Sequence, residues 1–179
     1  MGLQRLRSDR AMIQKNRSYA NRGKWLERII DLANNKYRSA GVADINKIPT
    51  PVQITEDNGR TVKGRKEKAT WVDYCGIYDG TAIIFDAKQI SGTNFPLANL
   101  EQHQYNLLKS WSEKGAVAFL LVYFSKQDKY YYLPFQTLKW AWERSETGGR
   151  KSIAFAEFET MAAEVKSKDG YTLHYLEAV

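Results

Sequence analysis

An Asp-Gly pair between two strand-like segments constrains this chain more than any other feature of its sequence. Residues 72–78 and 81–88 are rich in aliphatic and aromatic side chains, and Asp79-Gly80 separates them. Such a pair is typical of a two-residue type I′ turn, in which both central residues need positive φ. We therefore expect a β-hairpin in which Tyr78 lies opposite Thr81, and this pairing sets the register of the whole hairpin.

This register places two carboxylates on one face of the hairpin. Asp73 falls opposite Asp86, and directly opposed residues have Cβ atoms roughly 4.5–5.5 Å apart. Lys88 lies two residues further along its strand and shares that face. Two carboxylates so close repel each other unless a cation lies between them. The hairpin therefore predicts a site for a hard divalent ion such as Mg²⁺ or Mn²⁺. The alternative is an exposed strand with ion pairs, because Asp-x-Lys triplets are common.

The remaining sequence alternates helical and extended patterns. Apolar residues recur at helical spacing over residues 21–40, 96–114 and from Pro134 to just before Gly148-Gly149. Strands are expected over residues 42–48, over the apolar segment 116–124, and over residues 130–133, which should be more exposed; residues 174–176 should add an edge strand. This order predicts an α/β fold with a mixed central β-sheet flanked by helices.

Two segments differ from this pattern. Residues 1–20 are strongly basic, and we expect a flexible N-terminal arm before a single domain over residues 21–179. Residues 52–70 are polar and charged around the turn signal Asn58-Gly59, which predicts a hairpin projecting from the body. A solvated loop is the alternative; the functional interpretation is a basic finger that contacts phosphates. Its best DNA-contacting candidates are Lys63, Arg65 and Lys66.

The charge balance indicates an anionic partner. Lysine and arginine total 27 against 20 acidic residues, a net charge of +7, which favours nucleic acid. Cys75 is the only cysteine, so an internal disulfide is excluded and a reducing compartment is favoured. No apolar segment reaches the ~18 residues of a membrane span. We therefore expect a soluble, cytoplasmic protein with no membrane partner.

Several short motifs make the sequence similar to a known family. They are Asn21-Arg22-Gly23 with Leu26-Glu27, Lys47-Ile48-Pro49-Thr50-Pro51-Val52-Gln53, Asp73-Tyr74 with Gly76, Phe85-Asp86-Ala87-Lys88, Phe95-Pro96-Leu97, His103-Gln104 and Tyr175-Leu176. Together they resemble the RecU-type Holliday junction resolvases, which belong to the restriction-endonuclease-like PD-(D/E)xK nuclease superfamily. The family usually has glutamate where this chain has Asp86, and the superfamily accepts either. The segment between Pro51 and Thr70 is shorter than in cellular members, which suggests a divergent, phage-borne member.

The resemblance implies a role for individual residues. Asp73 and Asp86 would be metal ligands together with the backbone carbonyl of Ala87, and Lys88 would be the catalytic lysine.

Three further positions are also candidates: the resemblance implies the roles of Glu27 and Gln104, and the place of Arg22 in the sequence suggests its role. Glu27 would bind the metal through water, although an exposed helix glutamate is the alternative. Gln104 would position the attacking water or hold a phosphate, and without the resemblance it would be a surface residue. Arg22, near a helix N-terminus, would bind a phosphate of DNA.

The resemblance also implies an activity. The expected enzyme is a homodimer that uses Mg²⁺, with Mn²⁺ able to substitute, to nick a four-way DNA junction symmetrically in recombination and repair. The projection at residues 52–70 would correspond to the family's stalk and lie near the centre of the junction. Recombination proteins are expected partners, in the nucleoid of a bacterial cell or phage-infected host. Two alternatives remain: a sequence-specific or general DNA endonuclease of the same fold, and a non-catalytic module that binds junctions.

Overall fold

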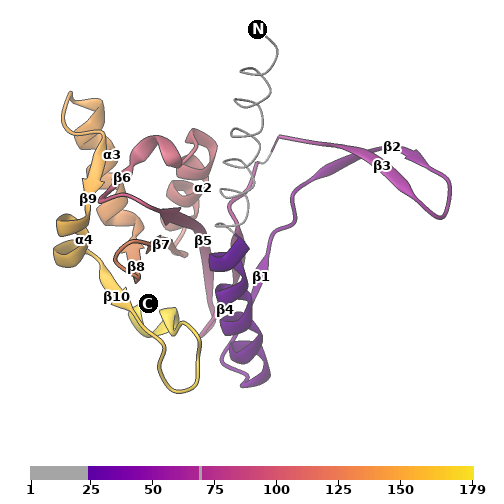
Figure 1. Ribbon diagram of the computed structural model, residues 1–179, viewed down its shortest axis with the longest axis horizontal. Helices are drawn as coiled ribbons and strands as arrows, with labels where there is room; N and C mark the ends of the chain where they lie inside the picture. Colours follow the sequence, from indigo (N-terminus) through magenta and orange to yellow (C-terminus); the bar gives the residue numbers. More distant parts are fainter. Residues whose placement is uncertain (1–23, 69) are drawn as a thin grey trace, which may run out of the picture.

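The computed structural model describes residues 24–68 and 70–179. Its centre is a six-stranded sheet in the order β1-β4-β5-β7-β8-β10 (Figure 1). The strands are β1 (Ala43–Lys47), β4 (Tyr74–Tyr78), β5 (Thr81–Ile90), β7 (Val117–Phe124), β8 (Lys129–Pro134) and β10 (Ala163–Val165). Strands β5 and β7 are parallel and all other neighbours are antiparallel. The sheet is therefore mixed, as the sequence predicts.

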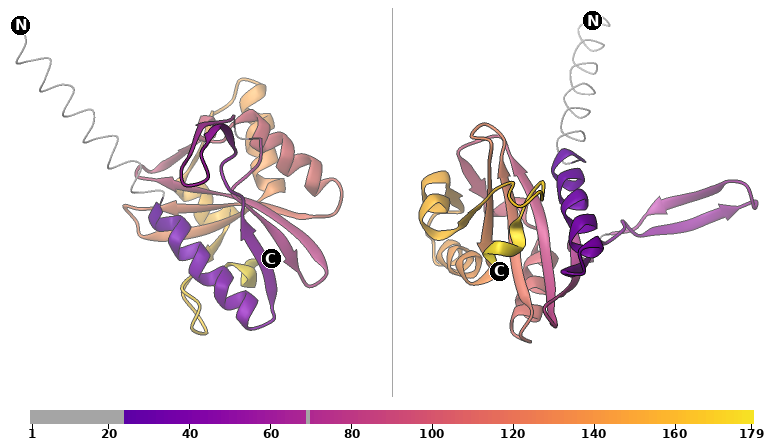
Figure 2. Two further views of the ribbon diagram at one scale, coloured as in Figure 1. Left: turned by 90° about the vertical axis from the view of Figure 1, so that its right-hand side faces the viewer. Right: turned by 90° about the horizontal axis from the view of Figure 1, so that it is seen from below.

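Helices cover both faces of this sheet (Figure 2). Helices α2 (Gln102–Ser112), α3 (Phe135–Glu146) and α4 (Phe155–Met161) pack on one face, and the helix over residues 24–39 packs on the other with the 3₁₀ helix η2 (Tyr175–Ala178). Along β7, Leu120 and Val122 belong to the first core, whereas Phe119 and Leu121 belong to the second. A strand buried on both faces reads as a continuous apolar run, which explains the composition of β7.

The first described helix carries one apolar side toward the sheet. Leu26, Ile30, Ala33 and Tyr37 are buried and recur at helical spacing, and they pack in the same core as Tyr74 of β4. The helix ends before Gly41, whose φ of 67° suits a residue without a Cβ atom.

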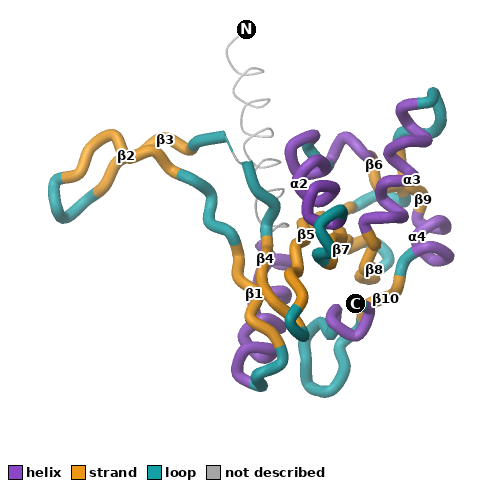
Figure 3. The backbone as a smooth tube through the Cα atoms, turned by 180° about the vertical axis from the view of Figure 1, so that it is seen from behind, coloured by secondary structure: helices purple, strands orange, loops and turns teal. Residues whose placement is uncertain are grey.

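A hairpin of strands β2 (Val52–Asp57) and β3 (Val62–Lys66) leaves the body between β1 and β4 (Figure 3). Every residue of both strands is exposed, and a β-bulge shifts the register between Ile54 and Glu56. The hairpin buries almost nothing against the body, so the projection predicted from the polar sequence is confirmed.

The helix predicted over residues 96–114 is shorter than expected. Asn94–Pro96 forms strand β6, which pairs with β9 (Ser152–Ala154), and a 3₁₀ turn η1 (Leu97–Asn99) follows. Helix α2 begins only at Gln102, where the backbone amide of Glu101 donates to Oε1 of Gln104 at 3.1 Å. The prediction was wrong because apolar spacing alone cannot locate a cap.

Two predictions about strands were also wrong. The strand expected to be more exposed, β8, lies between β7 and β10, and Tyr131, Tyr132 and Leu133 are buried because α4 and the C-terminal segment cover it. Residues 174–176 do not form an edge strand: Tyr175 begins η2 and its side chain is buried, with its hydroxyl on the buried carboxamide of Asn34.

None of the helices in the described ranges is long and apolar enough to cross a membrane.

We predict that Gly76→Ala destabilises the protein. Gly76 pairs with Ile45 of β1, and an added Cβ atom would lie 2.1 Å from the carbonyl oxygen of Asp44, which is backbone and cannot turn aside. Overpacking of this kind costs about 1–3 kcal/mol, and each kcal/mol lowers Tm by about 2–4 °C at this chain length. Thermal unfolding followed by circular dichroism measures the change. The control is Gly92→Ala, whose nearest atom would lie 3.9 Å away; equal Tm values for both variants would contradict the prediction.

Candidate active site

The hairpin of β4 and β5 has the turn and register that the sequence predicts. Asp79 and Gly80 have φ values of 46° and 73°, as a type I′ turn requires. Pairing runs from Tyr78 with Thr81 to Tyr74 with Phe85. Asp73 and Asp86 occupy the next position beyond this last pair.

Asp86 is fully buried, and two side chains contact its carboxylate from different elements. Its Oδ1 accepts a 2.7 Å hydrogen bond from Nε2 of Gln104 in α2, and its Oδ2 lies 2.7 Å from Nζ of Lys88. Lys88 also donates to Oε1 of Gln104 at 3.1 Å. Despite the short ion pair, Asp86 Oδ2 has no hydrogen bond of good geometry. The three side chains form a closed group at which one carboxylate oxygen keeps unused acceptor capacity.

Asp73 lies at the same end of the hairpin and is less buried than Asp86. Its Oδ2 accepts a hydrogen bond of 3.0 Å from the backbone amide of Ala87. This bond joins the carboxylate of Asp73 to β5, the strand that carries Asp86. It holds Asp73 in place although the backbone pairing of the two strands ends one residue earlier, at Tyr74 and Phe85. The structure therefore brings together four of the predicted site residues: Asp73, Asp86, Lys88 and Gln104.

The two carboxyl groups perturb each other. Burial, and then the negative charge of Asp73, raise the pKa of Asp86 to about 7 even though Lys88 favours its ionised form. Burial also raises the pKa of Asp73, against the hydrogen bond from Ala87 and the charge of Lys88. Two ionised carboxylates in one buried site are unfavourable without a further positive charge.

The donor set suits a hard cation held by few protein ligands. No cluster of three or more His, Cys, Asp or Glu side chains able to hold a metal occurs within residues 24–68 and 70–179. Two carboxylates and the free acceptor capacity of Asp86 Oδ2 nevertheless fit an ion such as Mg²⁺, which keeps several waters and takes one or two protein carboxylates.

Glu27 lies on the helix over residues 24–39, which covers the sheet face opposite to α2. Its carboxylate accepts a 2.7 Å ion pair from Nζ of Lys47 at the end of β1. The charge of Glu27 raises the pKa of Asp73, so it is near enough to affect the site, although it does not contact Asp86 or Lys88 directly. Glu27 and its partner Lys47 thus lie outside the group formed by Asp73, Asp86, Lys88 and Gln104.

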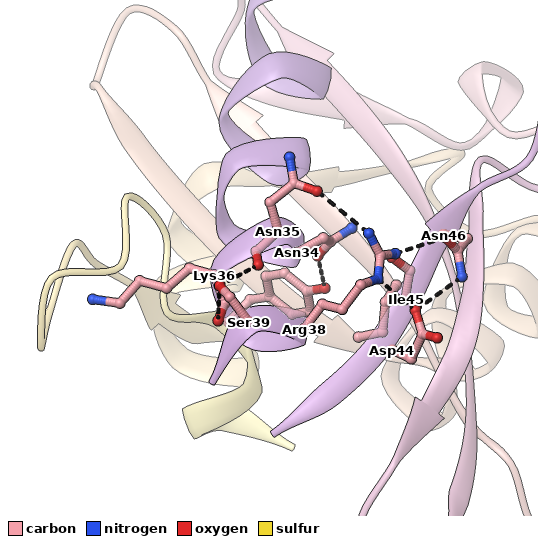
Figure 4. A network of polar contacts seen from close by, with 9 residues as sticks. Asn34, Asn35, Lys36, Arg38, Ser39, Asp44, Ile45 and Asn46 are labelled. Atoms are coloured by element: carbon pink, nitrogen blue, oxygen red, sulfur yellow. Dashed lines mark hydrogen bonds and ion pairs between the residues drawn. The ribbon is translucent and has the colours of Figure 1, made fainter. Parts of the chain in front are cut away.

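A polar network joins the last turns of the same helix to β1 (Figure 4). Arg38, on the same helix as Glu27, donates to Asp44 Oδ1 at 2.9 Å and to Asn46 Oδ1 at 2.7 Å, and Asn46 in turn donates to Asp44 at 3.1 Å. The hydrogen bond from Arg38 lowers the pKa of Asp44. Because Asp44 and Asn46 belong to β1, the network fixes this strand, and with it Lys47, against the helix.

The basic residues proposed for DNA contact do not share one face of the β2–β3 hairpin. Lys63 and Arg65 are two residues apart on β3 and share one face of the hairpin. Lys66 follows Arg65 directly, so its side chain points to the other face, and it pairs with Val52 of β2. Lys63 also forms an exposed 2.7 Å ion pair with Glu56. Arg22 and the basic arm over residues 1–20 lie outside the described residues.

Two residues near the site were not identified from the sequence as functional candidates. Lys47 was noted only within the Pro-Thr-Pro string, and its ion pair with Glu27 joins residues 20 positions apart. Trp71, two residues before Asp73, is 42% exposed. Its position next to Asp73 was the one signal available in the sequence.

Comparison with known proteins is consistent with this geometry. Residues 21–179 match the family described as Recombination protein U (RecU). The Holliday junction resolvase RecU of Pediococcus pentosaceus is 38% identical over 168 residues, covering 90% of this chain and 84% of that protein. The resolvase of the same name from Staphylococcus carnosus is 37% identical over 168 residues, covering 90% and 81%. The structure of Hjc, a Holliday junction resolvase from Archaeoglobus fulgidus, shares the fold with a TM-score of 0.51 at 16% identity, covering 79% of this chain and 95% of that one.

The raised pKa of Asp86 predicts how stability depends on pH without metal. An unfolded aspartate titrates near pH 4, whereas folded Asp86 titrates near pH 7. Between pH 4 and pH 7 Asp86 is ionised in the unfolded state but still protonated in the folded state. Its contribution to the free energy of unfolding is therefore greatest below about pH 4 and is lost as the pH rises through 7. We expect the Tm of the wild type, minus that of Asp86→Asn, to fall from pH 4 to pH 8 in EDTA.

Added Mg²⁺ provides the control for this measurement. At pH 8 it should raise the Tm of the wild type and leave that of Asp86→Asn nearly unchanged, since ligand binding to the folded state alone is stabilising. A Tm difference that is constant with pH would show that Asp86 titrates normally.

Proposed function

The chain belongs to the Recombination protein U family, and on this premise we propose that it is a metal-dependent endonuclease that resolves four-way DNA junctions by nicking. The observation that carries the proposal is the closed group of Asp86, Lys88 and Gln104 beside Asp73. It presents two carboxylates and an ammonium group at one end of a hairpin, in a chain with a net charge of +7.

We assign the metal-binding role to Asp73, Asp86 and the backbone carbonyl of Ala87. Mg²⁺ is the expected ion, with Mn²⁺ able to substitute, because both prefer oxygen donors. When bound, the ion supplies positive charge to the phosphate oxygens and makes water more acidic. Asp86 is suited to this role because burial and Asp73 disfavour its ionised form without a cation.

Lys88 and Gln104 complete the chemistry. The side chain of Lys88 is 19% exposed, so its ammonium group can meet a phosphate while Asp86 and Gln104 fix its position. In that position it would stabilise negative charge that develops on the phosphate during cleavage. The amide of Gln104 bonds to both Asp86 and Lys88, so we assign it the positioning of these two groups, with contact to the attacking water as a further role.

Glu27 is the outermost member of the proposed set. Its carboxylate is paired with Lys47 and about one-third exposed, and we assign it contact with the metal through water. This is the role that the resemblance to the family implies for Glu27.

The β2–β3 hairpin is the proposed recognition element for the junction. Its exposed strands carry basic side chains on both sides, which suits an element surrounded by phosphates. Lys63, Arg65 and Lys66 are the proposed DNA contacts, together with Arg22 outside the described residues. A homodimer with two active sites would match the two-fold symmetry of a four-way junction and nick it symmetrically. We expect it to act in the cytoplasm, on DNA that recombination proteins have joined.

Cleavage of a synthetic four-way junction tests the proposed function. With Mg²⁺, the wild type should nick two opposed strands, and Asp86→Ala should lower the rate roughly 100- to 1,000-fold, a loss typical of removing a group that stabilises transition-state charge. Single-turnover cleavage with mapped cut positions measures both, with EDTA as a metal-free control. A linear duplex of the same sequence is the control substrate. Equal or faster cutting of the duplex would favour a general endonuclease, and the absence of any nicking would favour a binding module.

Shortening the hairpin separates recognition from folding. Replacing residues 54–64 by Asn-Gly joins Gln53 to Arg65, which already pair, through a two-residue turn. Because all the removed residues are exposed, Tm should change little, whereas the preference for junction over duplex should fall at least tenfold. Gel-shift titration and circular dichroism provide the two measurements. A large loss of Tm with junction preference retained would contradict the assignment.

A further inference from the structure

A pocket at the root of the β2–β3 hairpin adjoins the candidate active site. It has a volume of about 320 Å³ and is lined by residues 48–51, which lead into the hairpin, and residues 70–73, which leave it. Asp73 belongs to this lining, so the pocket and the proposed metal site share a wall. A ligand in the pocket would therefore lie next to Asp73, a proposed metal ligand.

Among the described residues, Trp71 is the one aromatic residue that lines this pocket. The side chain is 42% exposed, and its contact with Trp111 of α2 is edge-to-face, with ring centroids 5.7 Å apart and an interplanar angle of 77°. An edge-to-face contact uses at most one face of the Trp71 ring, so the exposed part remains open to a planar ligand. Trp111 packs against the core between the sheet and helices α2, α3 and α4, and its contact holds the indole ring of Trp71 in position.

The walls of the pocket are built to be rigid. Pro49 and Pro51 fix two φ angles of the chain that enters the hairpin. The two segments are also joined, since the amide of Ile48 donates to the carbonyl of Asp73 at 2.8 Å and that of Glu67 donates to Pro51 at 3.0 Å. A preformed pocket loses little entropy when a ligand binds.

The chemistry around the pocket selects the ligand. The indole offers a flat apolar surface, Thr50 and Thr70 place hydroxyl groups in the lining, and the exposed Lys66 and Lys68 lie just before it in sequence. A nucleobase attached to a phosphodiester has the matching features: a π-face, polar edges and a negative charge. Stacking on aromatic side chains is a general way in which proteins hold single bases.

We propose that this pocket takes the nucleobase next to the scissile phosphate and that Trp71 stacks on it. The inference rests on the proposed function, because it assumes that a DNA strand crosses Asp73. Trp71 then acts as a specificity-determining residue: it holds one base of the cleaved strand and thereby favours some cut positions over others. Unpaired or distorted bases at a branch point meet this requirement at lower cost than bases in a duplex.

Three substitutions separate stacking from packing. Trp71→Phe keeps an aromatic face, Trp71→Leu keeps apolar bulk, and Trp71→Ala removes both. The control is Trp140→Ala on α3, because Trp140 is 47% exposed and does not line the pocket. Single-turnover cleavage of a four-way junction with Mg²⁺ should fall roughly tenfold or more for the Ala and Leu variants, with a flatter distribution of cut positions. Trp71→Phe should lose clearly less activity than the Ala and Leu variants, and Trp140→Ala should cut like the wild type.

A second readout does not depend on cleavage. Junctions that each carry one 2-aminopurine at a position next to the branch point are mixed with protein in EDTA. At least one of these positions should lose fluorescence with the wild type and Trp71→Phe but not with the Ala and Leu variants. The Tm of each variant checks that it folds, and its mass in solution checks assembly.

The outcomes distinguish the two proposals. If the wild type quenches the probe but never cuts, the nuclease function fails and the base pocket stands. Cutting and quenching that are unchanged in Trp71→Ala overturn the pocket alone. So does full activity in Trp71→Leu, which would show that only apolar bulk matters. A change in the mass of Trp71→Ala in solution would instead make Trp71 a contact between copies of this chain.

Discussion

The Asp86 carboxylate has no exposed surface, so the fold itself must compensate its charge. Lys88, two residues along the same strand, supplies an opposite charge, and Gln104, from a helix on one face of the sheet, supplies a hydrogen bond. The same Gln104 accepts the amide of Glu101 at the first turn of α2. The start of this helix and the orientation of the lysine therefore depend on one amide side chain, which also holds Oδ1 of Asp86.

This dependence explains why the site lies where the layers of the fold meet. Strand β5 carries Asp86 and Lys88 toward α2, whereas Glu27 belongs to the helix on the other face. Lys47, at the end of β1, forms an ion pair with Glu27 just before the chain enters the root of the β2–β3 hairpin. Arg38 binds Asn46 and so fixes β1 against the helix that carries Glu27. The proposed catalytic group is rigid because its members come from packed elements, and the proposed recognition hairpin projects from these elements. This division suits a nuclease that must hold its own carboxylates fixed while it accepts a branched substrate.

The hairpin and the site are mechanically joined although the hairpin buries almost nothing. Asp73 is the shared residue: its carbonyl holds Ile48 at the root, and its carboxylate holds Ala87 in β5. A force on the hairpin from bound DNA would therefore act on the backbone of a proposed metal ligand. If the proposed roles hold, contact with the junction and the geometry of the cleavage site are coupled through Asp73.

The sequence determined the parts of this protein that depend on local chemistry. The Asp79-Gly80 turn requires positive φ at both positions, and that requirement alone set the register that brings Asp73 to Asp86. The polar segment at residues 52–70 and the apolar segment at 117–124 likewise indicated an exposed and a buried element. Only the tertiary structure decided which faces are covered. It buried β8, moved the start of α2 to Gln102, made Tyr175 part of a 3₁₀ helix, and brought Lys47 to Glu27 and Trp71 to Trp111. These outcomes depend on contacts between distant segments, and no spacing within one segment can specify its partner.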